Sequence, residues 1–188
     1  KLPFVTCKLA ISKDFFTINR KNKWITNLYS RSRVHLMRSN HDCVMTSSET
    51  VINDNPLLTC RINGLEKRSP SRIILDRKLR IPINSKIIKK DGNYSTIIFH
   101  SKVNKRKIKL LKNYGVKLYK IPVNEDNHLN LKKVLIKTKE LGFSRIFLEA
   151  GINLSTNFLK DNLVNDLKIF ISNKRLKKDG LGSIKKYF

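Results

Sequence analysis

The feature that most constrains the fold is a regular alternation of strand-like and helix-like segments after residue 70. Short apolar runs that predict strands occur at residues 71–76, 96–99, 116–121 and 145–148. Between them, residues 105–114 and 131–141 have the spacing of amphipathic helices, and a glycine follows each one. Strands that alternate with helices pair mostly in parallel. The sequence therefore predicts an α/β fold with a mostly parallel central sheet and helices on both faces.

Further elements are predicted on either side of this region. Strands are expected at 4–11, 43–46 and 167–171, and helices at 30–40, 49–53 and 154–160. A chain of 188 residues with no internal repeat and no low-complexity linker suits one domain over residues 1–188.

The chain is strongly basic, with 40 lysines and arginines against 14 acidic residues and a formal net charge of +26. Such a charge favours nucleic acid or an anionic surface as a partner. The lysines, however, are spread over the whole chain and form no stripe with interleaved aromatic residues. We therefore interpret the charge as a general bias in composition that draws anionic substrates, and we expect no specific nucleic-acid partner.

Three cysteines, Cys7, Cys43 and Cys60, are widely spaced and include no C-x-x-C pair. This pattern favours buried thiols over disulfides or a zinc site. The four histidines show no pairing with a serine or cysteine that would indicate a nucleophile, so we expect them to be structural or exposed. No run is apolar enough to span a membrane and no signal peptide opens the chain. The expected location is the cytoplasm, with no membrane partner.

The segment from Ser47 to Arg61 carries the strongest functional signal. An apolar run, 43–45, leads into two serines, a short acidic turn, an Asn-Pro pair and an arginine. A strand that opens into hydroxyl and helix-starting residues places donors at its carboxyl end, where open α/β sheets bind ligands and phosphates in particular.

Two other strand ends carry weaker signals. Glu149, Ala150 and Gly151 follow the strand at 145–148, and a glycine there would let a pyrophosphate approach the start of a helix. The alternative for Glu149 is a solvated acid. Arg77 could bind a 2′-phosphate and Asp76 a ribose hydroxyl, or both could form an ordinary charged turn.

Two arginines, Arg38 and Arg61, could clamp a phosphate, because a guanidinium group matches phosphate in a bidentate fashion. In so basic a chain the simpler interpretation is a pair of surface residues. Trp24, the only tryptophan, fits a core anchor as well as it fits a cofactor wall.

These signals occur together in the order of one family. The motifs are K-L-A-x-S-x-D at 8–14, W-I-T at 24–26, an Arg-Val-His-Leu-Arg pattern at 31–38, T-S-S-x-T-V-x-x-D-x-P-x-L-T-x-R at 46–61, R-I-I-L-D at 72–76 and L-E-A-G at 148–151. Over nearly its whole length the chain resembles the reductase domain of the bifunctional riboflavin-biosynthesis deaminase–reductase.

The resemblance implies a dihydrofolate-reductase-like fold and NADPH-dependent reduction of 5-amino-6-(5-phosphoribosylamino)uracil to its ribitylamino product. By position in the motifs, it implies substrate contacts for Asn22, Arg38, Leu58, Arg61 and Glu149. It implies NADPH contacts for Ala10, Trp24, Thr50, Asp54, Arg77 and Gly151. It implies no metal, and it assigns no catalytic residue.

Three departures from the family pattern stand out. Phe15 and Asn22 replace a usual glycine and a usual serine, and the chain ends before the family's last strand. The strand at 167–171 would then be an open edge, which favours a homodimer. The H-x-E and P-C-x-x-C signature of zinc deaminases is absent, so a deaminase would belong to another domain or protein.

Other functions remain open at this point. A reductase of the same fold could act on a pterin or folate, although such a site would need an acid where the helix at 30–40 offers arginines. A basic nucleic-acid-binding module is supported only by net charge. A domain that binds its ligand without turnover is a third alternative.

Overall fold

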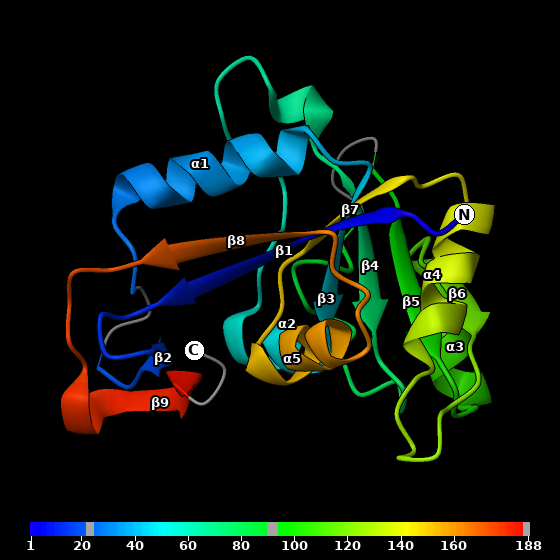
Figure 1. The fold of residues 1–188 in the computed structure, drawn as a ribbon. Helices are drawn as coiled ribbons and strands as arrows, with labels where there is room; N and C mark the ends of the chain where they lie inside the picture. Colours follow the sequence, from blue (N-terminus) through cyan, green and yellow to red (C-terminus); the bar gives the residue numbers. More distant parts are fainter. Residues whose placement is uncertain (22–24, 90–93, 186–188) are drawn as a thin grey trace.

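The structure is a computed structural model that describes residues 1–21, 25–89 and 94–185 (Figure 1). Its strands are β1 (Phe4–Ile11), β2 (Phe16–Asn19), β3 (Cys43–Ser47), β4 (Ser71–Leu75), β5 (Thr96–His100), β6 (Lys117–Lys120), β7 (Arg145–Leu148), β8 (Asp166–Ile171) and β9 (Gly180–Ser183). Its helices are α1 (Leu28–Ser39), α2 (Ser48–Asp54), α3 (Lys105–Asn113), α4 (Leu131–Glu140) and α5 (Ile152–Lys160), with short 3₁₀ turns at Glu66–Arg68 and Lys177–Asp179. Every predicted strand and helix is present, within a few residues of the expected bounds.

Seven strands form one sheet in the order β6-β5-β4-β3-β7-β1-β8, and all of its neighbouring pairs are parallel. The prediction of a mostly parallel α/β sheet is confirmed. After β3 the chain continues through β4 and β5 to β6 at one edge of the sheet, whereas after β7 it continues to β8 at the other edge. The connections therefore run in opposite directions from the adjacent strands β3 and β7. Open α/β sheets bind ligands at such a switch point, outside the carboxyl ends of the strands.

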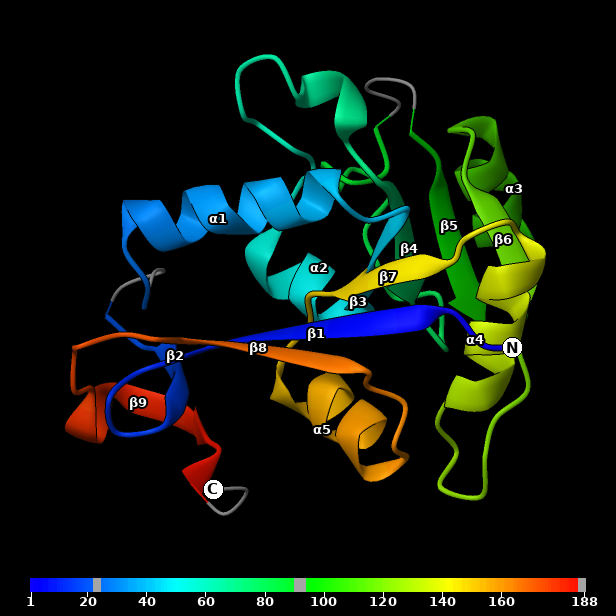
Figure 2. The same cartoon turned by 45° about the horizontal axis from the view of Figure 1, so that its top comes forward.

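The two faces of the sheet are covered by different helices (Figure 2). On one face, Cys7, Met45 and Leu148 belong to a core with α4 and α5. On the other face, Val44 and Phe147 belong to a core with α1, α2 and α3. Neighbouring residues of β3 and β7 point to opposite faces, as strand geometry requires, and both faces are buried. This explains why successive residues such as Val44 and Met45 of β3 are both apolar.

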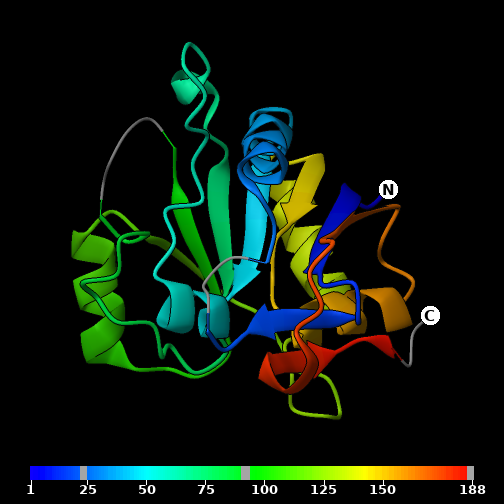
Figure 3. The same cartoon turned by 90° about the vertical axis from the view of Figure 1, so that its left-hand side faces the viewer.

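A second, two-stranded sheet joins β2 and β9, which are far apart in the chain. It stands at the end of the molecule where β1 and β8 finish (Figures 1 and 3). The Phe16 ring covers Gly180, and a Cβ at that glycine would clash with the ring. Neither strand is predicted from the sequence, because four residues such as Phe16–Asn19 show no clear alternation and depend on a distant partner.

The loop before β2 turns through Phe15, whose φ of 66° lies in the left-handed region. Glycine adopts this conformation without steric cost, which accounts for the glycine that is usual in the resembling family. Phe15 therefore keeps the backbone turn while adding a side chain.

At one edge of the large sheet, β8 pairs with β1 and, among the described residues, with no other strand. Its Ile171 is 67% exposed. The predicted open edge at 167–171 is thus present in the described part of the chain. Within these same residues, no helix is both long and apolar enough to cross a membrane.

Candidate active site

A cleft with a cavity volume of about 1260 Å³ lies at the carboxyl ends of the central strands, between α1, α2 and α5. It is lined by all nine of the predicted site residues that the structure describes, which are Ala10, Arg38, Thr50, Asp54, Leu58, Arg61, Arg77, Glu149 and Gly151. Asn22 and Trp24 lie outside the described residues. Motifs that are up to about 140 residues apart in the chain therefore meet at one site.

The centre of the cleft holds a buried ion pair between Arg38 of α1 and Glu149, which follows β7. The Arg38 Nε donates to Glu149 Oε1 at 2.6 Å and Nη2 donates to Oε2 at 3.0 Å. Each side chain is only 11% exposed. The third nitrogen, Nη1, donates to the Thr59 carbonyl at 3.0 Å. The interpretations of Glu149 as a solvated acid and of Arg38 as a surface residue are wrong.

The pair determines the charge state of Glu149. Burial by itself would raise the pKa of this carboxyl, but the charge and hydrogen bonds of Arg38 outweigh burial, and Lys8 adds to the effect. The pKa of Glu149 is therefore lowered, and the carboxyl is ionised at neutral pH. A bidentate guanidinium–carboxylate pair also fixes the direction of both groups.

Lys8 of β1 is a cleft residue that the sequence analysis did not single out. The register pairs Cys7 with Leu148, so the next residues, Lys8 and Glu149, follow side by side on adjacent strands. Burial lowers the pKa of the Lys8 ammonium, Glu149 opposes this shift and Arg38 adds to it. A lysine with a lowered pKa beside a carboxylate is a candidate for proton transfer. Its only sequence signal was the K-L-A motif.

Arg61 lies at the rim of the cleft and contacts a histidine of α1. Its Nη2 lies 3.2 Å from His35 Nε2, and its backbone nitrogen lies 3.2 Å from His35 Nδ1. The sequence predicts that His35 is structural or exposed, and the structure places it in the lining of the cleft. The sequence did not reveal this contact, because the two residues lie on separate elements.

The starts of two helices meet at the switch point between β3 and β7. Thr50, in the first turn of α2, accepts a hydrogen bond from the Gly151 N–H at 3.3 Å. Gly151 begins α5 without a side-chain cap, whereas Asn27, Asn104 and Asn130 cap other helices. Uncapped N–H groups at a helix start bind phosphate groups well. A Cβ placed at Gly151 would meet no atom within 4 Å. The close approach of a ligand to this glycine stays a prediction.

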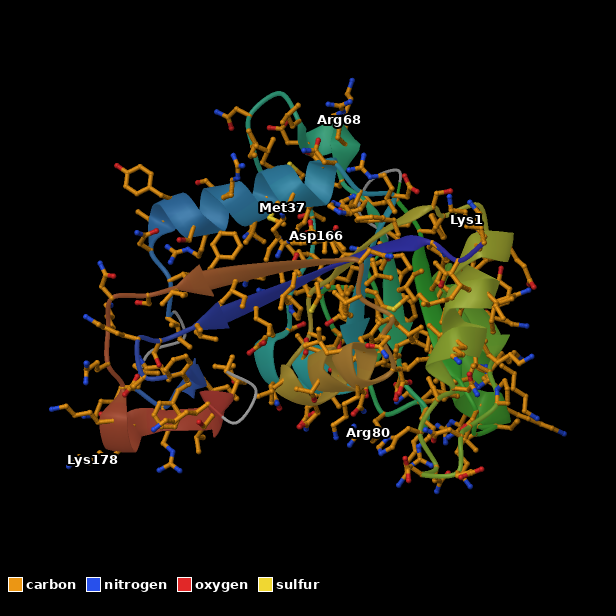
Figure 4. The ribbon with its side chains drawn as sticks, viewed as in Figure 1. Lys1, Met37, Arg68, Arg80, Asp166 and Lys178 are labelled. Atoms are coloured by element: carbon orange, nitrogen blue, oxygen red, sulfur yellow. The ribbon has the colours of Figure 1, made fainter. Side chains whose placement is uncertain are left out.

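The far end of the cleft is basic. Arg77, Lys78, Arg80 and Lys86 line it, and the Arg77 Nη1 donates to Asn127 Oδ1 at 2.7 Å. Figure 4 labels Arg80 on the side of the molecule toward which β3, β4 and β5 run. Asp76, by contrast, is fully buried and accepts from the Ile81 N–H at 2.9 Å. The alternative that Asp76 binds a ribose hydroxyl is wrong, because this carboxyl closes a turn.

Leu58 reaches the cleft with an unusual backbone, whose φ is 56°. Its side chain is buried in the core that α1 and α2 cover. A left-handed conformation is uncommon for a residue other than glycine and is often found at functional sites.

Metal binding finds no support in the described residues, among which no group of three or more histidine, cysteine or acidic side chains is placed to hold an ion.

Comparison with known proteins places this cleft in a defined family. Residues 3–176 match the sequence profile described as the RibD C-terminal domain. The chain is 34% identical over 174 residues to the riboflavin biosynthesis protein RibD of Aquifex aeolicus, covering 92% of this chain and 47% of that protein. The chain thus spans about half the length of such relatives.

A shorter relative is the 5-amino-6-(5-phosphoribosylamino)uracil reductase of Buchnera aphidicola from Acyrthosiphon pisum, which is 31% identical over 84% of this chain and 78% of its own length. The solved structure of Acinetobacter baumannii RibD superposes with a TM-score of 0.80 at 26% identity, covering 95% of this chain and 48% of that one. The fold is thus dihydrofolate-reductase-like, and the chain belongs to the RibD C-terminal domain family.

Proposed function

We propose that this chain catalyses the NADPH-dependent reduction of 5-amino-6-(5-phosphoribosylamino)uracil to 5-amino-6-(5-phosphoribitylamino)uracil in riboflavin biosynthesis. The observation that carries the proposal is the occurrence in one cleft of the buried Arg38–Glu149 ion pair, with Lys8 beside it, and of two adjacent helix starts. The cluster suits a polar, reacting sugar, and the helix starts suit a dinucleotide. Family membership and the named Buchnera reductase support the same reaction.

The test is oxidation of NADPH, followed at 340 nm, with one NADPH consumed for each ribitylamino product formed. We expect turnover with the aminouracil substrate and none with dihydrofolate or a dihydropterin. Turnover with a pterin alone would support the alternative reductase. Stoichiometric NADPH binding without turnover of the aminouracil substrate would support a domain that only binds its ligand.

Within this proposal, the side chains of the cleft have distinct tasks. NADPH, when bound, supplies the hydride that reduces the former anomeric carbon of the substrate. When the ribosylamine ring opens, the bond between the anomeric carbon and the ring oxygen breaks. We assign protonation of that oxygen to the Lys8 ammonium, and the protonated imine that keeps its N–H then accepts the hydride to give the neutral ribitylamine. Glu149 attracts the Lys8 ammonium, and we propose that it also orients the substrate, because Arg38 fixes the direction of its carboxylate.

The substrate phosphate is assigned to the basic rim. The sequence predicts that both Arg38 and Arg61 bind this phosphate. In the structure, three nitrogens of Arg38 already donate to Glu149 and Thr59. We therefore propose that Arg61 contacts the phosphate directly, and that Arg38 contributes its positive field. Leu58 forms the wall beside them.

The basic end of the cleft provides the preference for NADPH over NADH. We expect Arg77→Ala to weaken NADPH binding by about 10-fold or more and to leave NADH binding unchanged, because loss of a charge-assisted contact costs about 1.5–3 kcal/mol. Fluorescence titration with both cofactors measures this. Lys89→Ala, outside the cleft lining, is the control. Equal affinities that do not change in Arg77→Ala would rule out a 2′-phosphate role.

The pyrophosphate of the cofactor is assigned to the starts of α2 and α5, with Ala10, Thr50 and Asp54 beside it. A Cβ at Gly151 meets nothing within 4 Å, and no left-handed φ is required there. We expect Gly151→Ala to keep its melting temperature but to bind NADPH about 10-fold more weakly, since the methyl group fills space that the ligand needs. Unchanged NADPH affinity would place the pyrophosphate elsewhere.

Two partners complete the proposal. Curated RibD relatives are about twice the length of this chain, and we propose that a deaminase, in another domain or protein, produces the substrate. The cytoplasmic location and the absence of a specific nucleic-acid partner stay predictions. The region 1–188 is proposed to act as a single reductase domain.

A second copy of the chain is the proposed partner of the β8 edge. Open edges with exposed apolar residues pair readily with other strands, and Ile171 and Leu167 are 67% and 37% exposed. We expect light scattering to give a dimer mass, and Ile171→Lys to give a monomer. Ile136→Lys, at an exposed position on α4, is the control. A wild-type monomer whose residues 167–171 resist hydrogen exchange would contradict the proposal.

A further inference from the structure

His35 is held on both of its ring nitrogens at the wall of the cleft. At Nδ1 lie the Thr59 carbonyl at 3.0 Å, the Arg61 backbone N–H at 3.2 Å and, more distantly, the Arg38 Nη1 at 3.5 Å. At Nε2 lies the Arg61 Nη2 at 3.2 Å. Three of these four contacts are donors, and two of them come from Arg61.

The set of partners favours a ring that retains a lone pair. A neutral imidazole has one N–H donor and one acceptor nitrogen. With its proton on Nδ1, the ring donates to the Thr59 carbonyl and leaves Nε2 to accept from the Arg61 guanidinium. A protonated ring has two donors and no acceptor. Its Nε2–H would then point at the Arg61 guanidinium, and its positive charge would repel that group.

We propose that neutral His35 is a positioning residue that holds the Arg61 guanidinium in place for the phosphate of the substrate. This inference rests on the proposed function of Arg61 as the phosphate contact. Arg61 lies on a segment without regular secondary structure between α2 and the 3₁₀ turn at Glu66–Arg68, so the contact with His35 ties its side chain to the helix α1.

The charged groups around the ring act in the same direction. Burial lowers the pKa of His35, and Arg38 from α1 and Arg61 from the segment after α2 lower it further. The Thr59 carbonyl and Glu149, beyond β7, oppose these effects without cancelling them. The ring is therefore neutral at neutral pH, and it releases Arg61 only as the pH falls below the ordinary histidine range.

Two variants of His35 distinguish the contribution of Nε2 from that of Nδ1. Glutamine places an amide near the Nε2 position, where its oxygen accepts from the Arg61 guanidinium without titrating. Asparagine reaches only the Nδ1 position. We expect His35→Asn to raise KM for the phosphorylated substrate about 10-fold, as loss of one charge-assisted hydrogen bond implies. We expect His35→Gln to restore most of this loss. In both variants we expect kcat and NADPH affinity to stay within about 2-fold of wild type, which is a much smaller change than the tenfold change expected in KM.

The pH profile provides the readout that a merely structural histidine would not change. The substrate phosphate itself titrates near pH 6, so the informative quantity is KM of wild type divided by KM of His35→Gln. This ratio should rise as the pH falls from 7.5 to 5, because only wild type gains the proton. Nitrogen NMR of the labelled His35 ring should show a neutral imidazole at pH 6.5 and above.

The outcomes are distinguishable. If Arg61→Ala raises KM but His35→Asn does not, the positioning role of His35 is overturned and the proposed phosphate contact stands. If Arg61→Ala itself leaves KM unchanged, the role of Arg61 fails, and this inference fails with it. A flat KM ratio between pH 7.5 and 5, or a protonated ring at neutral pH, would also overturn it.

Discussion

Replacing Glu149 by glutamine should lower the free energy of unfolding by about 3–5 kcal/mol, because it leaves the Arg38 guanidinium buried without its counter-charge. Urea denaturation at pH 7 measures this loss. The matched control is Glu140→Gln, which breaks the exposed Lys137–Glu140 pair and should cost less than about 1 kcal/mol. Equal costs for the two variants would mean that the buried pair is not what stabilises the cleft.

The same pair predicts how stability changes with pH. Because the pKa of Glu149 is lower in the folded chain than in the unfolded chain, its contribution is fully present above the ordinary glutamate pKa of 4.5. It is lost as the pH falls through the lowered value. Wild type should therefore lose stability below about pH 4.5 as Glu149 becomes protonated. Glu149→Gln should not show this contribution, because glutamine does not titrate. If wild type and Glu149→Gln lost stability to the same extent as the pH falls, the pKa of Glu149 would not be lowered in the folded chain.

The second large effect concerns Arg61. Arg61→Ala should raise KM for the aminouracil substrate about 10- to 150-fold, which corresponds to a lost charge-assisted contact of about 1.5–3 kcal/mol. NADPH affinity should be unchanged, because Arg61 lies on the α1 side of the cleft and the cofactor is assigned to the helix starts. Arg61→Lys should also bind poorly, since an ammonium lacks the planar fork.

A nearby arginine provides the control for this experiment. Arg68, labelled in Figure 4 on the 3₁₀ turn at Glu66–Arg68, is exposed and does not line the cleft. Arg68→Ala lowers the net charge by the same amount, so it reports the general electrostatic attraction of a basic chain for an anion. If both variants raise KM equally, the effect belongs to net charge and not to a phosphate contact.

The sequence by itself determined the main architecture. Strand and helix periods, with glycines such as Gly115 and Gly142 at helix ends, predicted the parallel sheet and its two helical layers, because these signals are local. The motifs also identified nine residues that the structure brings to one cleft. Each motif marks a strand end or helix start, and parallel strands place their carboxyl ends at the same edge of the sheet.

Only the tertiary structure decided the partners of those residues. Neither the pairing of Arg38 with Glu149, the place of Lys8 beside them nor the contact of His35 with Arg61 could be predicted from spacing. The ribbon of β2 and β9 was missed for the same reason. A side chain's partner and its pKa depend on which distant segments pack against it. That is set by the whole fold, whereas a sequence pattern reports only the preferences of its own segment.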